Sequence, residues 1–134
     1  MAKAGRMLIA VIAGAVVWAV LWIGGTQGLQ AAFPETLAPD RPVSHTGFLL
    51  TYIGYSVLLS LLAGWVTAAV QGQRPMPAVW ILAALQLTLG IIAEVSYWSL
   101  VPVWYHVVFL ALVVPATVYG GTLRARRVVA RTSE

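Results

Sequence analysis

Four long runs of apolar residues, separated by short polar segments, dominate the chain. They cover about residues 7–25, 46–70, 78–97 and 104–123. As a helix with a rise of about 1.5 Å per residue, the first run is about 28 Å long, close to the thickness of the hydrocarbon core of a membrane. Backbone groups in lipid must be paired within their own segment, and the runs lack the alternation of a barrel strand. The pattern therefore predicts an all-α bundle of four transmembrane helices.

The composition excludes an ordinary soluble domain. Of 134 residues, 60% are hydrophobic and 9% are charged, whereas about 25% is the usual charged fraction. The chain contains no cysteine, which excludes disulfides, thiolate metal sites and iron–sulfur clusters. We therefore predict a single integral membrane domain covering residues 1–134.

The basic residues predict the orientation of the spans. Positive charge close to a span end is retained on the cytoplasmic side. Seven basic residues fall on one side of the predicted spans, and only Arg41, in the predicted outer loop 26–45, falls on the other; the seven are Lys3, Arg6, Arg74, Arg124, Arg126, Arg127 and Arg131. We expect an antiparallel up-down-up-down bundle with both termini in the cytoplasm, in a membrane of the bacterial inner-membrane type.

Residues 124–134 form a basic tail directly after the fourth run. We predict that Arg124, Arg126, Arg127 and Arg131 lie on anionic lipid headgroups, since each cation near such a surface contributes about 1 kcal/mol. The tail lacks the interleaved aromatic residues of a nucleic-acid-binding segment. The bilayer and its anionic lipids are thus the expected partners, and nucleic acid is not.

Small residues predict where helices meet. Ser56, Ser60, Gly64 and Ala68 recur every four residues and so share one helical face, which favours close packing against another helix. We expect Trp18 and Trp22 to face lipid or a neighbouring helix, and Pro115 to kink the fourth span and offer a hinge. Since four short helices enclose little more than a narrow cleft, we also expect self-association or a place in a larger membrane complex.

Glu94 is the residue most indicative of a site, because a carboxyl inside a span is expensive and generally functional. Gln86 and Glu94 share one helical face, and His106 begins the next span after a short turn. We predict contact between Glu94 and His106, with Tyr52, Tyr55 or Tyr105 as a third partner.

Three roles are open for this polar site. The pair could fix the register of the hairpin as a structural contact, or it could exchange protons or bind a substrate in an outward-facing cavity. Alternatively, His45 and His106 could be the axial ligands of a haem held between facing helices. No other cofactor and no metal site are expected.

No enzyme motif is present, neither G-x-S-x-G nor H-E-x-x-H nor a nucleotide-binding loop. In length and number of spans the chain resembles the small multidrug resistance transporters. That family carries its essential acid in the first helix, whereas the acid here lies in the third, so the likeness is one of size and topology. The leading prediction is a structural or accessory membrane protein, with a small transporter or ligand-binding protein and a haem protein as alternatives.

Overall fold

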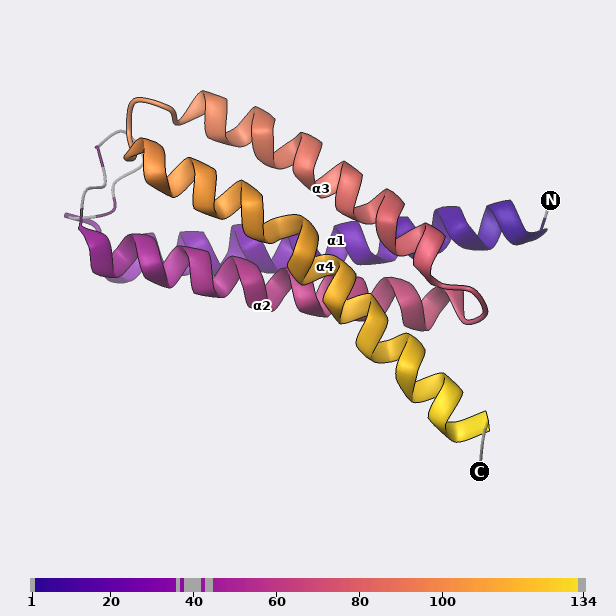
Figure 1. Ribbon diagram of the computed structural model, residues 1–134. Helices are drawn as coiled ribbons and strands as arrows, with labels where there is room; N and C mark the ends of the chain where they lie inside the picture. The colour runs from indigo at the N-terminus through magenta and orange to yellow at the C-terminus, as the bar shows by residue number, and fades with distance from the viewer. Residues whose placement is uncertain (1, 36, 38–41, 43–44, 133–134) are drawn as a thin grey trace.

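The structure, a computed structural model of the 134-residue chain, describes residues 2–35, 37, 42 and 45–132. It contains four helices: α1 (Ala2–Ala32), α2 (Thr46–Gln71), α3 (Met76–Ser96) and α4 (Val103–Thr132) (Figure 1). Each is long and apolar enough to cross a membrane, and the described residues form no strand. The predicted all-α fold with four membrane-spanning helices is confirmed at this level.

Two helices are longer than the apolar runs that predicted them. α1 continues past Gly25 to Ala32, so the connection to α2 is shorter than the predicted loop 26–45. Leu29, Gln30, Ala31 and Ala32 favour a helix, and Pro34 disfavours helical backbone in the residue before it. α4 runs through Pro115 without interruption to Thr132, so most of the predicted tail is helical. The role of Pro115 as a hinge stays a prediction.

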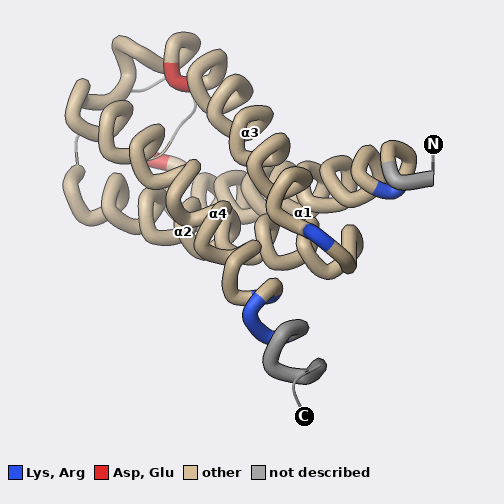
Figure 2. The backbone as a smooth tube through the Cα atoms, turned by 45° about the vertical axis from the view of Figure 1, so that its right-hand side comes forward, with Lys and Arg blue, Asp and Glu red and all other residues tan. Residues whose placement is uncertain are grey.

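The charged residues separate along the bundle. The end of α1, the start of α2 and the α3–α4 connection lie at one end in Figure 1, and the α2–α3 connection lies at the other end, towards the start of α1 and the end of α4. Figure 2 shows the described basic residues, which are Arg6, Arg74, Arg124, Arg126 and Arg127, towards the second of these ends, here called the arginine end. Glu35 and Glu94 lie towards the opposite end, here called the glutamate end. Arg41 lies outside the described residues.

The backbones of α2 and α4 approach each other closely at two points, and a glycine lies at each of them. A Cβ atom on Gly64 of α2 would overlap the carbonyl of Thr117, and one on Gly120 of α4 would overlap the carbonyl of Leu61. Ser56, Ser60, Gly64 and Ala68 of the predicted stripe are all buried. The contact has the geometry expected where small residues let helices approach in lipid.

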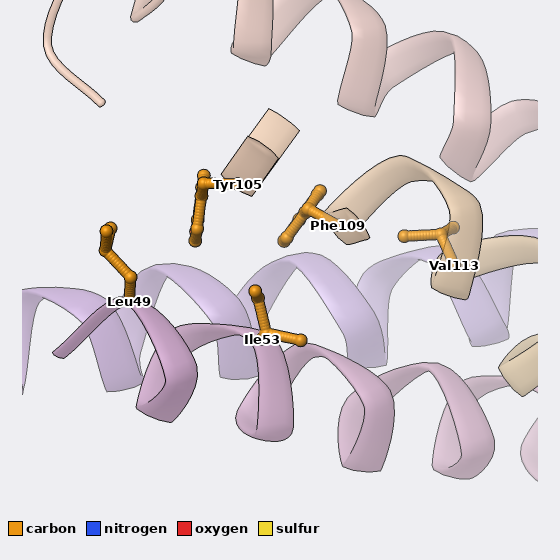
Figure 3. Close-up of a cluster of buried hydrophobic side chains, with 5 residues drawn as sticks. All are labelled: Leu49, Ile53, Tyr105, Phe109 and Val113. Carbon is orange, nitrogen blue, oxygen red and sulfur yellow. The ribbon is translucent and has the colours of Figure 1, made fainter. Parts of the chain in front are cut away.

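The packing changes character from one end of the bundle to the other. Towards the arginine end, α1 meets its neighbours through Ala10, Val11 and Ala78, and Gly14 lies directly against Thr67. Towards the glutamate end the buried residues are larger. Figure 3 shows side chains of α2 and α4 pointing toward one another in this half; they are Leu49, Ile53, Tyr105, Phe109 and Val113. The helices are therefore packed through small residues at one end and through large ones at the other.

This arrangement predicts the effect of filling the α2–α4 contact. Gly64→Leu should lower the free energy of unfolding by about 3 kcal/mol, because the side chain would displace the backbone of α4. The measurement is unfolding of the purified protein in mixed micelles by increasing fractions of a denaturing detergent. Gly54→Leu is the matched control on the same helix, since a Cβ there meets nothing within 4 Å. Equal effects of the two substitutions would contradict the close contact.

Candidate functional site

Glu94 and His106 lie in direct contact at the glutamate end. Glu94 is in the last turns of α3 and His106 in the first turn of α4, and Oε2 of the carboxyl is hydrogen-bonded to Nδ1 of the imidazole. The side chain of His106 is 1% exposed and that of Glu94 is 10% exposed. Two polar groups that would be costly to bury singly are thus buried as a pair.

The turn between α3 and α4 fixes the ring of His106. The indole of Trp98 stacks on the imidazole with centroids 4.5 Å apart and planes inclined by 8°. Nε2 of His106 also lies 3.3 Å from the carbonyl oxygen of Trp98. Both ring nitrogens therefore have partners, and one of these comes from the backbone.

The hydrogen-bond partners of His106 determine how many protons the Glu94–His106 pair holds. A carbonyl oxygen can only accept, so Nε2 of His106 donates its hydrogen to Trp98. The bond between Nδ1 and the Oε2 atom of Glu94 then contains one further proton, whichever of the two atoms carries it. The hydrogen-bonded pair has no net charge in either case, and it can lose that one proton.

Beside the pair is a cavity of about 320 Å³ enclosed by all four helices. Glu94 is one of the residues that line it, and its Oε2 atom is hydrogen-bonded to His106. Oε1 of Glu94 accepts no hydrogen bond from any residue that the structure describes. Glu94 is the one charged residue among the described lining residues, which include no basic side chain.

Aromatic rings form much of the cavity wall. They come from α1, α2, α4 and the turn after α3, and they are Trp18, Trp22, Tyr52, Tyr97, Tyr105 and Phe109. Trp22 links three of the helices, since its ring centroid lies 6.0 Å from that of Tyr52 and 5.5 Å from that of Phe109. Thr26 and Gln30 add polar groups from α1. The site thus combines one carboxyl with several aromatic faces.

Several residues that line the cavity are also exposed on the outside of the bundle. They include Ile23 of α1, Leu89 of α3 and Tyr97 of the turn after α3, which are 54%, 44% and 53% exposed. By contrast, the lining residues Leu49 of α2 and Phe109 of α4 are buried. The lining thus includes exposed residues of α1 and α3, two helices apolar enough to lie in a membrane.

Leu37 occupies part of the cavity wall from the connection that follows α1. It is 1% exposed and its N–H donates a hydrogen bond to the carbonyl of Phe33 at 2.9 Å. A single apolar side chain from this connection thus reaches the cavity from the glutamate end.

Gln86 lies two helical turns from Glu94 on the buried face of α3. Its Oε1 accepts a hydrogen bond from the hydroxyl of Thr117, while its Nε2 has no partner among the described residues. Gly90 lies between Gln86 and Glu94 on this face and lines the cavity. The predicted polar stripe of α3 thus points into the bundle, and only its Gly90–Glu94 part reaches the cavity.

The two tyrosines predicted for the polar site have different positions. Tyr52 lines the cavity, whereas Tyr55 donates a hydrogen bond of 2.6 Å to the carbonyl of Leu21. Gly25 leaves room for the ring of Tyr55 against α1. Tyr55 therefore joins α1 to α2. The ring centroid of Tyr105 lies 6.1 Å from that of His106, and a tyrosine as third partner of the pair stays a prediction.

The two histidines considered as haem ligands, His45 and His106, lie in different surroundings. His45 is exposed at the start of α2, where its ring lies 5.2 Å from that of Phe48. Both nitrogens of His106 are engaged by Glu94 and Trp98, so neither is free for iron in this arrangement. Within the described residues, no group of three or more His, Asp or Glu residues could hold a metal ion.

The basic residues of α4 lie far along the helix from the site. The guanidinium of Arg124 lies over the ring of Trp65, 5.0 Å from its centroid, while Arg126 and Arg127 are exposed. The side chain of Arg131 lies outside the described part of the chain. Contact of these cations with lipid headgroups stays a prediction.

Several residues of the site had no clear signal in the sequence. Trp18 and Trp22 pack against neighbouring helices, which was one of the two expectations for them, but both also line the cavity, which was not predicted. The carbonyl of Trp98 and the side chain of Leu37 lie in connections, whose backbone course depends on tertiary packing. The spacing of Trp18, Trp22 and Thr26 on one helical face was the available signal for a wall facing the bundle.

The buried pair yields a prediction about stability. His106→Ala should lower the free energy of unfolding by about 3 kcal/mol, because the Glu94 carboxyl would lose its partner and Trp98 its stacked ring. Thermal unfolding in detergent, followed by circular dichroism, measures the change. Ser96→Ala is the control in the same turn, because the hydroxyl of Ser96 bonds only to its own helix. Unchanged stability of His106→Ala would show that the contact is not structural.

Comparison with known proteins identifies no relative from which to transfer a function. No protein-family model, curated protein or solved structure matches the chain. The chemistry of the site therefore has to be inferred from its own residues.

Proposed function

We propose that this chain is a multi-pass membrane protein that binds a small, largely apolar molecule in the cavity beside Glu94. The single observation that carries the proposal is the position of Glu94, whose carboxyl belongs both to a buried hydrogen-bonded pair and to the wall of an aromatic cavity. Ligand sites are concave and mostly apolar with a few converging polar groups. A contact with a purely structural role would need no cavity beside it.

The distribution of basic residues supports an orientation for the bundle. We place the arginine end in the cytoplasm and the glutamate end on the far side, because basic residues are retained on the cytoplasmic side of a membrane. The bundle then has the antiparallel up-down-up-down topology, with both termini cytoplasmic, in a cytoplasmic membrane of the bacterial type. Glu94 and the cavity lie in the outer half.

We infer that the cavity opens laterally between α1 and α3, so that a ligand enters from the lipid. Ile23 of α1 and Leu89 of α3 line the cavity and are exposed, and the solvent around these helices is the hydrocarbon of the bilayer. A ligand that reaches the site by this path is soluble in lipid and carries a polar group for the Glu94 carboxyl. The pair can still fix the α3–α4 hairpin, so the predicted structural role and the binding role are compatible. Self-association stays a prediction.

The orientation is testable by labelling, since the chain has no native cysteine. Ser99→Cys lies in the exposed α3–α4 turn and Gln73→Cys in the exposed α2–α3 turn. A membrane-impermeant maleimide applied to intact bacterial cells producing the protein should label Ser99→Cys only. Gln73→Cys should react after permeabilisation, which also serves as the control for reactivity. The reverse pattern would place the cavity in the cytoplasmic half.

Filling the cavity tests the binding function. The probe is 4-bromoneopentylbenzene, whose bromine quenches tryptophan fluorescence on contact and should quench Trp18 and Trp22. Ala93→Phe places a ring in the cavity wall and should weaken quenching about tenfold, because the volume for the probe is lost. Ala84→Phe is the matched control on an exposed position of α3 outside the cavity. Quenching that is equal in wild type and both variants would locate the probe in bulk detergent or lipid and overturn the proposal.

A further inference from the structure

The charge on the cavity wall restricts which ligands suit the site. Apart from Glu94, its described lining residues are uncharged. A ligand anion would meet a carboxyl and no basic group, which disfavours it in a medium of low dielectric constant. A ligand cation would meet the unoccupied Oε1 atom of Glu94, so the wall is electrostatically complementary to positive charge.

The kind of cation follows from the remaining lining. Small metal ions need several oxygen ligands, and the cavity offers one carboxyl, with no metal-binding group among the described residues. The faces of Trp22, Tyr52 and Tyr105 instead suit a weakly hydrated organic cation, which aromatic rings attract through their quadrupoles. Substituted ammonium groups with apolar arms have this chemistry, and they also enter lipid.

The proton count of the pair shows what happens when such a cation binds. With its shared proton the Glu94–His106 pair is neutral, so an added cation would leave one uncompensated positive charge in the membrane. Loss of the shared proton leaves a Glu94 carboxylate beside a neutral His106, and the carboxylate then balances the cation. The proton goes to water and the imidazole keeps the hydrogen on Nε2 that bonds to the carbonyl of Trp98.

We propose that the cavity binds a lipophilic organic cation in exchange for the proton held between Glu94 and His106. This inference rests on the ligand-binding function proposed above and adds the class of ligand and the coupled ion. One cation enters and one proton leaves, so the charge inside the membrane is unchanged. The Glu94 carboxyl therefore interacts either with the bound cation or with the shared proton, but not with both at once.

Few other groups near the cavity can contribute to a pH dependence. Tyr105 of α4, Tyr52 of α2 and Tyr97 after α3 line it. α1 contributes Thr26 and Gln30, which do not titrate. The proton that a bound cation would replace is thus the one shared by Glu94 and His106.

The test compares two brominated probes of the same shape on the purified full-length protein in nanodiscs. One is the cation 4-bromobenzyltrimethylammonium, and the other is its neutral isostere 4-bromoneopentylbenzene. Quenching of tryptophan fluorescence reports binding of each. Calorimetric titration of the cation in two buffers of different ionisation enthalpy reports the protons released.

We expect the affinity for the cation to rise with increasing pH, by up to about tenfold per pH unit. Binding should release close to one proton per bound cation. Binding of the neutral probe should not change with pH. Glu94→Gln should remove the pH dependence and the proton release, and Ser96→Ala should behave as wild type. If Glu94→Gln does not fold, the proton release measured on the wild type still decides the question.

The outcomes separate this inference from the function on which it rests. Suppose that the neutral probe binds the wild type and that Ala93→Phe weakens this binding. If the cation then binds without proton release, or does not bind at all, the exchange is wrong and the binding function stands. If neither probe quenches the wild type, the inference and the binding function both fail. Proton release that persists in Glu94→Gln would assign the proton to another group and overturn the exchange.

Discussion

Lipid as the surrounding solvent is the constraint on which this structure depends. In hydrocarbon no water is present to pair a polar group, so each such group must find its partner inside the bundle. Glu94 and His106 meet this constraint together, with the carbonyl of Trp98 as the third member. The hairpin between α3 and α4 is therefore defined by a polar contact, although nearly all residues around it are apolar.

The gradient of side-chain size along the bundle accounts for the cavity at the glutamate end. Gly14, Gly64 and Gly120 allow the helix backbones to approach one another closely. Trp22 and Phe109 separate the helices in the other half, where flat rings cannot fill the interior completely. The polar pair lies in the half that has this space.

Much of the fold was readable from sequence because it depends on local properties. The length and apolar character of the four runs sufficed for four membrane-spanning helices. Their ends did not follow from hydropathy, since residues after Gly25 are less apolar yet still helical. Four-residue spacing placed Gln86 and Glu94 on one face, and the short turn placed His106 near Glu94.

Other parts of the site depend on distances between helices, which the sequence does not contain. Tyr52 and Tyr55 are close in sequence and chemically alike, but one lines the cavity while the other bonds to Leu21 of α1. That difference arises from Gly25, which admits the ring of Tyr55 against the neighbouring helix.

The proposed lateral entry to the cavity has a consequence for any measured affinity. A molecule arriving between α1 and α3 would be drawn from the pool dissolved in the bilayer, whose concentration equals the aqueous concentration multiplied by a partition coefficient. Two compounds that fit the cavity equally well would differ in apparent dissociation constant by the ratio of their partition coefficients. Under this proposal the membrane is the first stage of selection, and the aromatic wall with its carboxyl is the second.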